Sequence, residues 1–559
     1  MDKSDVVIIG GVACGCKTAA SLARRKPEFK ITLFQKEKEL SYGTCGLPYF
    51  ASGDIDSFRQ LTETNYNVVR DIDFFKNSKG FDAVAESEVT KIDREKKIVH
   101  VKDLKSGDVY QHGYDKLVLA TGASPVTPPI DFPQSDRISH FTRPSAAINF
   151  RKSAQTGQVG SALILGGGFI GCELAESCGG LWGLETTLVE KEPQLLPYVL
   201  DREMSLPVEK HLAENDVNVL VDTRVTKVEA PDDDTVVVTL TNDKKVTVDY
   251  LFVCAGVRPA SELAREAGLE LGESGGIAVD DSMRTSDPDI YAGGDVVELR
   301  HQVTGQPLYI PMGSLANRHG RIIAENIAGG NSRFPGALGA FMVKVFDYNV
   351  GTVGLSQSAA EAEGMEVFSV WGSFVDRPDY YPETEPVSVK IVIDSQTDLL
   401  LGVQAIGRGD VVRRIDVGSV FLQNKCRLDD LIDFEHGYAP PYSEALDPLY
   451  HLATQAKAIK RGFKIDSPDT IYDNAEIQVL DVREPDEIEA LPFQASNLIT
   501  ISLNDLRDNL DKLERNRPIA VLCHRGPRSY QAACILKAAG FEQVSYVGGG
   551  TTLSVKSLA

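Results

Sequence analysis

Residues 161–171 have the sequence SALILGGGFIG, and this stretch decides the fold of the chain. Its apolar run is typical of a strand buried on both faces of a parallel sheet. Gly166, Gly168 and Gly171 then fit the pattern G-x-G-x-x-G, which lets the backbone approach a pyrophosphate at a helix N-terminus. Glu190 ends the next predicted strand, where a carboxylate binds ribose hydroxyls and repels a 2′-phosphate. The stretch therefore predicts an NADH site, and a glycine turn that only helps packing is the alternative.

A second unit of the same kind opens the chain. Residues 6–9 form an apolar strand, and Gly10 and Gly15 keep the outer glycines of the pattern around Val12. Gln35 stands where the ribose-binding acid is expected, and its amide can hydrogen-bond ribose without carrying a charge. Two such units predict two doubly wound α/β sheets with two dinucleotide sites.

The remainder of the chain predicts further domains. At about 150 residues per domain, 559 residues suggest three or four domains. The pattern becomes strand-rich after residue 330, which favours an α+β domain, and strands and helices alternate again after a linker at residues 462–468. The expected boundaries are 1–150 with 280–330 for the first dinucleotide-binding domain, 151–279 for the second, 331–460 for the α+β domain and 469–559 for the last α/β domain.

Composition narrows the choice of partners. The formal charge of −22 argues against nucleic acid or an anionic membrane as the main partner. No apolar run reaches the ~18 residues of a membrane span, and no signal peptide is recognised at the N-terminus. Most of the nine cysteines in such a chain are expected to be reduced thiols in a cytoplasm, and their spacing predicts no metal site.

Cys45 is the candidate redox residue. It lies in residues 41–49, SYGTCGLPY, directly after the second predicted strand, and Pro48 suits the first turn of a helix. A helix N-terminus stabilises a thiolate, so we expect Cys45 to be a good nucleophile at neutral pH. No second cysteine follows within a few residues, so the chemistry must use a mixed disulfide, a persulfide or a sulfenic acid. A buried, inert thiol is the alternative.

The other N-terminal cysteines have a simpler interpretation. Cys14 and Cys16 flank the first phosphate turn, and we expect them to be packing residues rather than a redox pair because this turn tolerates only small side chains. Five more cysteines are expected in the core, within helices or buried strands: Cys172, Cys178, Cys254, Cys426 and Cys534.

Residues 285–295, TSDPDIYAGGD, resemble the late flavin motif of the two-dinucleotide flavoprotein disulfide reductases. Residues 120–122, ATG, follow another apolar strand in the expected order. The resemblance implies FAD at the first site, with Asp295 contacting its ribityl-phosphate region. The residues expected at this FAD site are Gly10, Gly15, Gln35, Ala120, Thr121, Gly122 and Asp295.

Further motifs resemble the coenzyme A-disulfide reductase group, and their arrangement resembles its rhodanese-fused members, the NADH-dependent polysulfide or persulfide reductases. The matching residues are 10–13, 41–49, 166–173, 285–295, 317–321, 380–382 and 438–443. The last of these, YAPPYS, is the most specific. The resemblance covers nearly the whole chain and implies an oxidoreductase with FAD and NADH, a homodimer, and coenzyme A (CoA) as substrate or bound thiol.

The same resemblance implies roles for individual residues. The family cysteine that matches Cys45 forms a disulfide with CoA, and tyrosines that match Tyr380 and Tyr438 reach it from the partner subunit. Phe169 matches an aromatic residue on the nicotinamide side of the flavin. The cations that match CoA contacts are Arg24, Lys79 and Arg318. Fixed cationic donors are what the phosphates of CoA require in an acidic protein. Alternatively, Arg24 is a solvated helix end and the tyrosines fill the core.

Some positions depart from the family pattern. Thr44 replaces the asparagine that is common before the family cysteine, Glu383 replaces a glycine, and Gln35 and Cys14 are atypical. We expect these departures to alter the substrate pocket. CoA disulfide, CoA persulfide and polysulfide therefore remain alternative substrates.

Residues 522–529, LCHRGPRS, resemble the active loop of rhodaneses, in which the cysteine carries sulfane sulfur as a persulfide. The resemblance implies this role for Cys523, with loop amides and Arg528 stabilising the anion. Residues 481–484 match the family's Asp-x-Arg segment, whereas its His-Ile-Pro-Gly stretch is degraded near residues 494–497. An inactive rhodanese kept as a binding module is the alternative.

Together these motifs predict a two-stage enzyme. NADH reduces FAD, electrons pass to a disulfide of Cys45, and Cys523 accepts sulfane sulfur and hands it to CoA or a related thiol. One alternative is an NADH oxidase or peroxidase that uses a Cys45 sulfenic acid. Another is a redox-sensing flavoprotein with little turnover.

Overall fold

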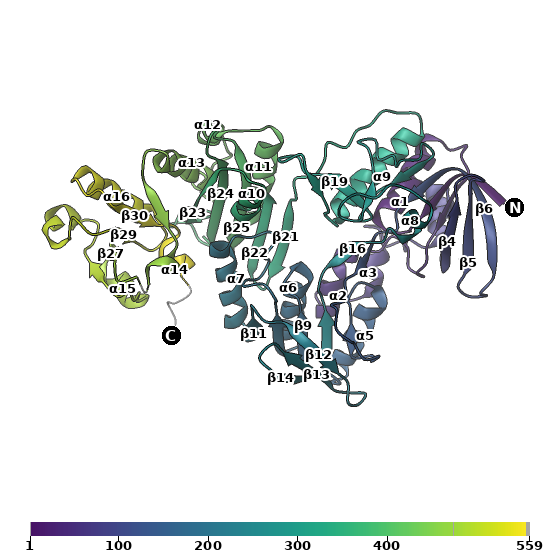
Figure 1. Cartoon of the computed structure of the whole chain (residues 1–559), viewed down its shortest axis with the longest axis horizontal. Coiled ribbons are helices and arrows are strands. Elements are labelled where there is room, and N and C mark those ends of the chain that lie inside the picture. The colour runs from purple at the N-terminus through teal and green to yellow at the C-terminus, as the bar shows by residue number, and fades with distance from the viewer. Residues whose placement is uncertain (1, 473, 555–559) are drawn as a thin grey trace. The chain divides into compact units, whose positions relative to one another are not determined.

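A computed structural model describes residues 2–472 and 474–554 of the chain (Figure 1). The described residues form two compact units, one from residues 2–189 with 223–337 and one from residues 190–222 with 338–472 and 474–554. Within the described residues, no helix is both long enough and apolar enough to cross a membrane.

The first unit opens with a sheet in the order β3-β2-β1-β6-β5-β4. The buried strand β1 pairs in parallel with β2 and β6, and β18 also pairs with β6, which brings the late segment 285–295 to this sheet. Helices α1 (Ala13–Arg25) and α9 (Gly313–Ile327) pack against each other. The strands are β1 (Asp2–Ile9), β2 (Ile31–Phe34), β3 (Asp82–Val84), β4 (Ser87–Asp93), β5 (Ile98–Asp103), β6 (Val109–Leu119) and β18 (Ile290–Ala292).

A second parallel sheet of the first unit carries the other glycine motif. Strand β9 lies between β10 and β15, and β15 pairs with β8. Helix α6 (Phe169–Ala175) follows β9 and continues into the π-helical turn η3 (Glu176–Leu181). The strands are β8 (Ile138–Ser139), β9 (Ser161–Leu165), β10 (Glu185–Val189) and β15 (Tyr250–Val253), with an antiparallel group of β12 (Val225–Glu229), β13 (Val236–Leu240) and β14 (Lys245–Val248).

The second unit contains an antiparallel sheet in the order β21-β22-β25-β24-β23. Helix α11 (Val411–Gln423) packs on β22 and β25, while α13 (Pro448–Ile459) packs on β23 and β24. Helix α7 (Arg202–Glu214) contacts β25. The strands are β21 (Phe341–Val345), β22 (Tyr348–Gly354), β23 (Val367–Val375), β24 (Pro386–Asp394) and β25 (Leu400–Gly407).

The C-terminal part of the second unit is a parallel sheet in the order β26-β30-β29-β27-β28. Separate apolar clusters that include Val521 and Leu522, neighbours in β29, are consistent with burial on both faces of this strand. The elements are β26 (Lys464–Asp466), β27 (Gln478–Asp481), β28 (Leu498–Thr500), β29 (Ile519–Leu522), β30 (Val544–Val547) and α16 (Pro527–Ala538). The predicted α/β fold class, with two doubly wound sheets, an α+β domain and a terminal α/β domain, is confirmed.

Four local predictions need correction. Residues 462–468 are not only a linker, because they contain the edge strand β26, which gains its hydrogen bonds from β30. Cys426 lies after α11, outside any helix or strand, and is half-buried rather than part of the core. Cys254 directly follows β15 and Cys534 lies on α16, and both are also half-buried.

Candidate active sites

Cys45 lies on a short 3-10 turn, η1 (Thr44–Gly46), which leads directly into helix α2 (Leu47–Ser52). The residue is exposed. A Cβ atom placed on Gly313 would lie 4.0 Å from Cys45 Sγ, so the sulfur faces the N-terminus of α9. Helix α9, which comes late in the sequence, and Cys45, which comes early, thus lie together in one site.

The electrostatics of Cys45 differ from expectation. Although the residue is exposed by surface area, enough atoms surround the sulfur for burial to raise its pKa, and Glu173 and Asp295 raise this pKa further. The start of α2 was expected to stabilise the thiolate and lower the pKa of Cys45. Burial and the two carboxylates outweigh that effect. Helix α2 spans only 6 residues, and two carboxylates oppose a third negative charge.

Glu173 is a functional candidate that had no assigned role in the sequence. It lies on α6, and Tyr49 Oη donates a hydrogen bond to Glu173 Oε1 at 3.3 Å. Burial raises the pKa of Glu173 to about 7, so this carboxyl group exchanges its proton near neutral pH. A carboxylate two positions after Gly171, on the helix that follows the glycine motif, is the signal that could have identified it.

We expect Glu173→Gln to make the Cys45 thiol easier to ionise. Removing the carboxylate removes a negative charge that raises the Cys45 pKa, so the midpoint of thiol alkylation should move to lower pH. Iodoacetamide labelling followed by mass spectrometry of the Cys45 peptide measures this midpoint. An unchanged or higher midpoint would show that Glu173 does not act on the thiol.

The first glycine motif fits a pyrophosphate. Gly10 has a φ of +108°, and a Cβ atom there would come 2.1 Å from the Ala120 carbonyl oxygen. A Cβ atom on Gly15 would come 1.8 Å from the Gly10 oxygen. No side chain caps α1 at Val12, so the amides of its first turn are suited to bind phosphate oxygens. This close packing fits the FAD site expected from the sequence.

Gln35 hydrogen-bonds the backbone of the first glycine turn. Its Oε1 accepts a hydrogen bond from the Gly11 amide at 2.7 Å, and its Nε2 donates to Glu37 at 2.9 Å. The side chain therefore holds the glycine turn, and its contact with ribose stays a prediction. Glu37, which the sequence analysis did not single out, presents a partly exposed carboxylate at this turn.

Asp295 is the last residue of the motif that resembles the flavin segment. It is largely buried, and burial raises its pKa to about 6. The neighbouring Gly294 amide donates to His319 Nδ1 at 3.2 Å, which ties this segment to α9. Cys14 packs against Gly293, and burial raises the pKa values of Cys14 and Cys16 to about 12. This confirms that these two cysteines are packing residues.

The second glycine motif repeats the geometry of the first. Gly166 has a φ of +114°, and a Cβ atom on Gly171 would come 1.9 Å from the Gly166 oxygen. Gly168 precedes α6 without a side-chain cap, and Phe169 begins the helix. Glu190 directly follows β10 in the chain, and its carboxylate accepts a hydrogen bond from the Glu192 amide at 2.9 Å.

The three cations expected to contact CoA lie on elements that meet at α1. Arg24 is exposed near the end of α1, Arg318 is exposed on α9, and Lys79 ends the turn η2 (Phe75–Lys79). Both α9 and η2 contact α1. The guanidinium of Arg318 lies over the ring of Phe334, and the ammonium of Lys79 lies over the ring of Phe74. Their contacts with CoA stay predictions.

The second unit brings Tyr380 and Tyr438 together. Both are exposed, and a hydrogen bond with Tyr438 raises the pKa of Tyr380. Tyr442, at 71% exposure, lies on the same loop as Tyr438. The two tyrosines do not fill the core, so that alternative is excluded.

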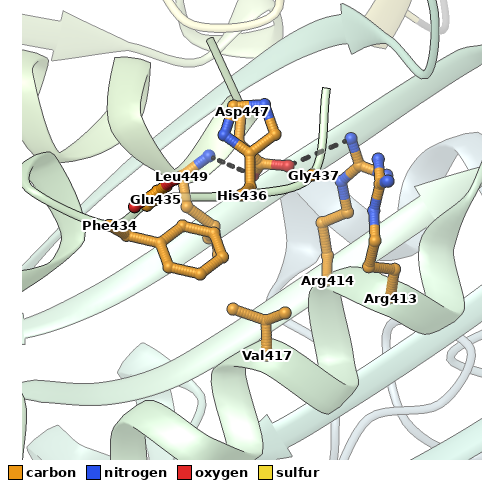
Figure 2. Close-up of a pocket in the computed structure, with 9 residues that line it drawn as sticks. All are labelled: Arg413, Arg414, Val417, Phe434, Glu435, His436, Gly437, Asp447 and Leu449. Carbon is orange, nitrogen blue, oxygen red and sulfur yellow. Dashed lines mark hydrogen bonds and ion pairs between the residues drawn. The ribbon is translucent and has the colours of Figure 1, made fainter. Parts of the chain in front are cut away.

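The loop that carries Tyr438 is held by contacts beside a cavity of about 230 Å³. Figure 2 draws the residues that line this cavity, among them His436 and Gly437. His436 Nε2 donates to the Glu444 carbonyl at 3.0 Å, and Arg413 donates to the Tyr442 carbonyl at 3.2 Å. The buried Arg414 pairs with Asp447 at 3.3 Å. These contacts fix where the loop presents Tyr438.

Cys523 lies directly after β29 and is buried. Its sulfur accepts a hydrogen bond from the Gly526 amide at 3.1 Å and lies 3.5 Å from Ser529 Oγ. Gly526 has a φ of +116°, which turns the loop back before α16 begins. A loop amide that points at sulfur suits a persulfide anion.

Arg528 has a partner that the sequence did not reveal. Its two Nη atoms lie 2.6 and 2.5 Å from the carboxylate of Glu487. This pair lowers the pKa of Glu487 to about 2. Arg528 thus faces Cys523 only as part of an ion pair, and its stabilisation of a persulfide stays a prediction. Asp481 and Arg483 form a fully buried pair in the same domain.

Comparisons with known proteins agree with this architecture. Residues 4–313 match the model for pyridine nucleotide-disulphide oxidoreductases, residues 341–450 match the dimerisation domain of that group, and residues 467–553 match rhodanese-like domains. A Pyrococcus abyssi protein named NAD(P)H sulfur oxidoreductase (CoA-dependent) is 32% identical over 81% of this chain and 98% of its own length.

Two further relatives bear on the chemistry. A Methanocaldococcus jannaschii protein named NADH oxidase is 30% identical over 80% of this chain and 98% of its own length. The solved structure of an NAD-dependent persulfide reductase from A. fulgidus is similar with a TM-score of 0.94 and 38% identity, covering 98% of this chain and 99% of that chain. The matches confirm the resemblance predicted from the motifs.

Proposed function

Because the chain belongs to the pyridine nucleotide-disulphide oxidoreductase family, we propose that it uses NADH to reduce a sulfur substrate carried by CoA. The substrate is CoA disulfide, CoA persulfide or a polysulfide. The observation that carries this proposal is Cys45, an exposed single thiol whose sulfur faces the start of α9, in the same chain as the rhodanese loop of Cys523.

The residues around the first glycine motif fit FAD. The amides at the start of α1 would hold the pyrophosphate, and Asp295 would contact the ribityl-phosphate region. When bound, FAD supplies the relay of electrons from NADH to a disulfide. The part of the chain in this step is to hold the nucleotides and to keep Cys45 beside α9.

Cys45 would carry the substrate sulfur. Its thiolate attacks a sulfur of CoA disulfide, one CoA leaves as a thiolate, and Cys45 and the second CoA form a mixed disulfide. Glu173 and Tyr49 would hold the proton near this site, since Glu173 has a pKa of about 7. Arg24, Arg318 and Lys79 would bind the CoA phosphates.

We propose NADH as the preferred reductant because Glu190 follows β10. Glu190→Ala should lower the ratio of kcat/KM for NADH to that for NADPH by roughly 10- to 100-fold, because about 1–3 kcal/mol of repulsion toward a 2′-phosphate is lost. Steady-state assays with both nucleotides measure the ratio. A ratio that stays at the wild-type value would assign the preference to another residue.

A homodimer is proposed from the exposed tyrosines and the dimerisation domain. Tyr380, Tyr438 and Tyr442 form an exposed aromatic group that a second copy of the chain would cover.

All nine cysteines are free thiols, which suits a cytoplasmic location.

An NADH oxidase is the second candidate, favoured by the Methanocaldococcus jannaschii relative of that name. In that reaction Cys45 would cycle through a sulfenic acid. The two functions separate in an anaerobic assay of NADH oxidation with CoA disulfide, CoA persulfide and polysulfide, repeated with oxygen alone. Turnover with the sulfur substrates under nitrogen supports the proposal, and turnover with oxygen alone supports the oxidase.

A further inference from the structure

A cavity of about 450 Å³ adjoins the rhodanese loop inside the second unit. His524 and Arg525, the two residues after Cys523, form part of its wall. Thr551 is another wall residue, and its amide donates to the Cys523 carbonyl at 3.0 Å. The cavity therefore borders the loop that carries Cys523, on the side of the Cys523 backbone carbonyl.

Other wall residues come from outside the rhodanese-like domain. Phe374 and Val375 of β23 and Lys210 of α7 line the cavity. The Ser373 amide donates to the Arg525 carbonyl at 3.2 Å, and Arg525 pairs with the Asp379 carboxylate at 3.1 and 3.3 Å. The rhodanese loop is thus held by residues of the dimerisation domain, and the cavity is complete only in the full chain.

The lining of the cavity specifies a kind of ligand. Phe374, Val375 and Leu491 supply apolar surface, and the hydroxyl-bearing Thr552 lies among them. The charge of Arg525 is balanced by Asp379, while the ion pair of Lys210 with Glu214 is long at 3.8 Å. A volume of this size is typical of a small-molecule site. A ligand with an arm of mixed apolar and amide character fits these walls, with its anionic group near Lys210.

We propose that this cavity seats the thiol that takes sulfur from Cys523, and that this thiol is a small molecule with an amide-bearing arm and an anionic group. Coenzyme A and glutathione belong to this class. The acceptor thiolate attacks the outer sulfur of the Cys523 persulfide, the S–S bond breaks, and Cys523 leaves as a thiolate. The acceptor becomes a persulfide, its proton passes to Cys523, and no external oxidant or reductant is needed.

This inference rests on the proposed function together with the sulfur transfer at Cys523 that the rhodanese resemblance implies, and it assigns Lys210 and Leu491 to acceptor binding. Lys210→Gln should lower kcat/KM about tenfold for CoA and glutathione but not for uncharged pantetheine, because only the charged thiols lose an ion-pair partner. Leu491→Trp should fill the cavity and lower kcat/KM about tenfold or more for all three thiols. Lys512→Gln, an exposed charge outside the cavity wall, is the matched control.

The experiment uses the full-length chain, with thiosulfate as donor. Mass spectrometry first measures one added sulfur atom on Cys523, and the loaded protein is then discharged with each thiol or with cyanide. Wild-type discharge to cyanide by the Lys210 and Leu491 variants, with slow discharge to the thiols, supports the cavity. Wild-type discharge to CoA by both variants would overturn it while sulfur transfer stands. A wild-type chain whose Cys523 never gains sulfur would overturn the proposed sulfur transfer itself.

Discussion

Cys45→Ser is expected to lower NADH-dependent reduction of CoA persulfide and CoA disulfide by at least about 1000-fold. A serine oxygen cannot form the mixed disulfide, so the proposed covalent path is removed rather than weakened. Stopped-flow and steady-state absorbance at the NADH band measure the loss. The reaction of NADH with the bound flavin should continue, because Cys45 takes no part in nucleotide binding in this account.

Two controls make the Cys45 result specific. Cys426→Ser removes a half-buried thiol from a loop of the second unit and should leave turnover within about twofold of wild type. Bound FAD, measured by absorbance, should be equal in both variants. Persistent turnover of CoA persulfide by Cys45→Ser would refute the proposed path, whatever the other residues do.

Cys523→Ala is expected to abolish sulfur transfer from thiosulfate to cyanide while sparing the reduction of CoA disulfide. Cys523 is the residue whose sulfur accepts the Gly526 amide bond, and alanine offers no atom to hold sulfane sulfur. We expect a loss of at least about 1000-fold in thiocyanate formation, with disulfide reduction within about twofold of wild type.

The matched control for this variant is Cys534→Ala, on the same helix that follows the loop. It should form thiocyanate at the wild-type rate. Equal thiocyanate formation by Cys523→Ala and wild type would support the alternative in which the rhodanese-like domain only binds a ligand.

The glycine motifs were predictable because backbone geometry leaves no other choice of residue. At Gly15 and Gly171 a single added carbon would collide with the carbonyl of the first glycine of the motif, Gly10 or Gly166. The apolar strand β9 was predicted from its sequence, since a run buried on both faces carries a strong signal. Cys45 and Cys523 could be placed at the ends of predicted strands in the same way.

The electrostatics of the sites could not be predicted from the sequence. The raised pKa of Glu173 depends on burial, and its hydrogen bond comes from Tyr49, a residue distant in the chain. The pairing of Arg528 with Glu487 also joins distant segments. The edge strand β26 escaped prediction because three residues form a strand only once β30 supplies a partner.

The most direct test is mass spectrometry of the Cys45 peptide after anaerobic incubation with CoA disulfide, before and after NADH is added. We predict that one CoA is attached to Cys45 through a disulfide and that NADH removes it. A Cys45 that stays unmodified while NADH is consumed, or that is linked to another cysteine of the chain, would contradict the account.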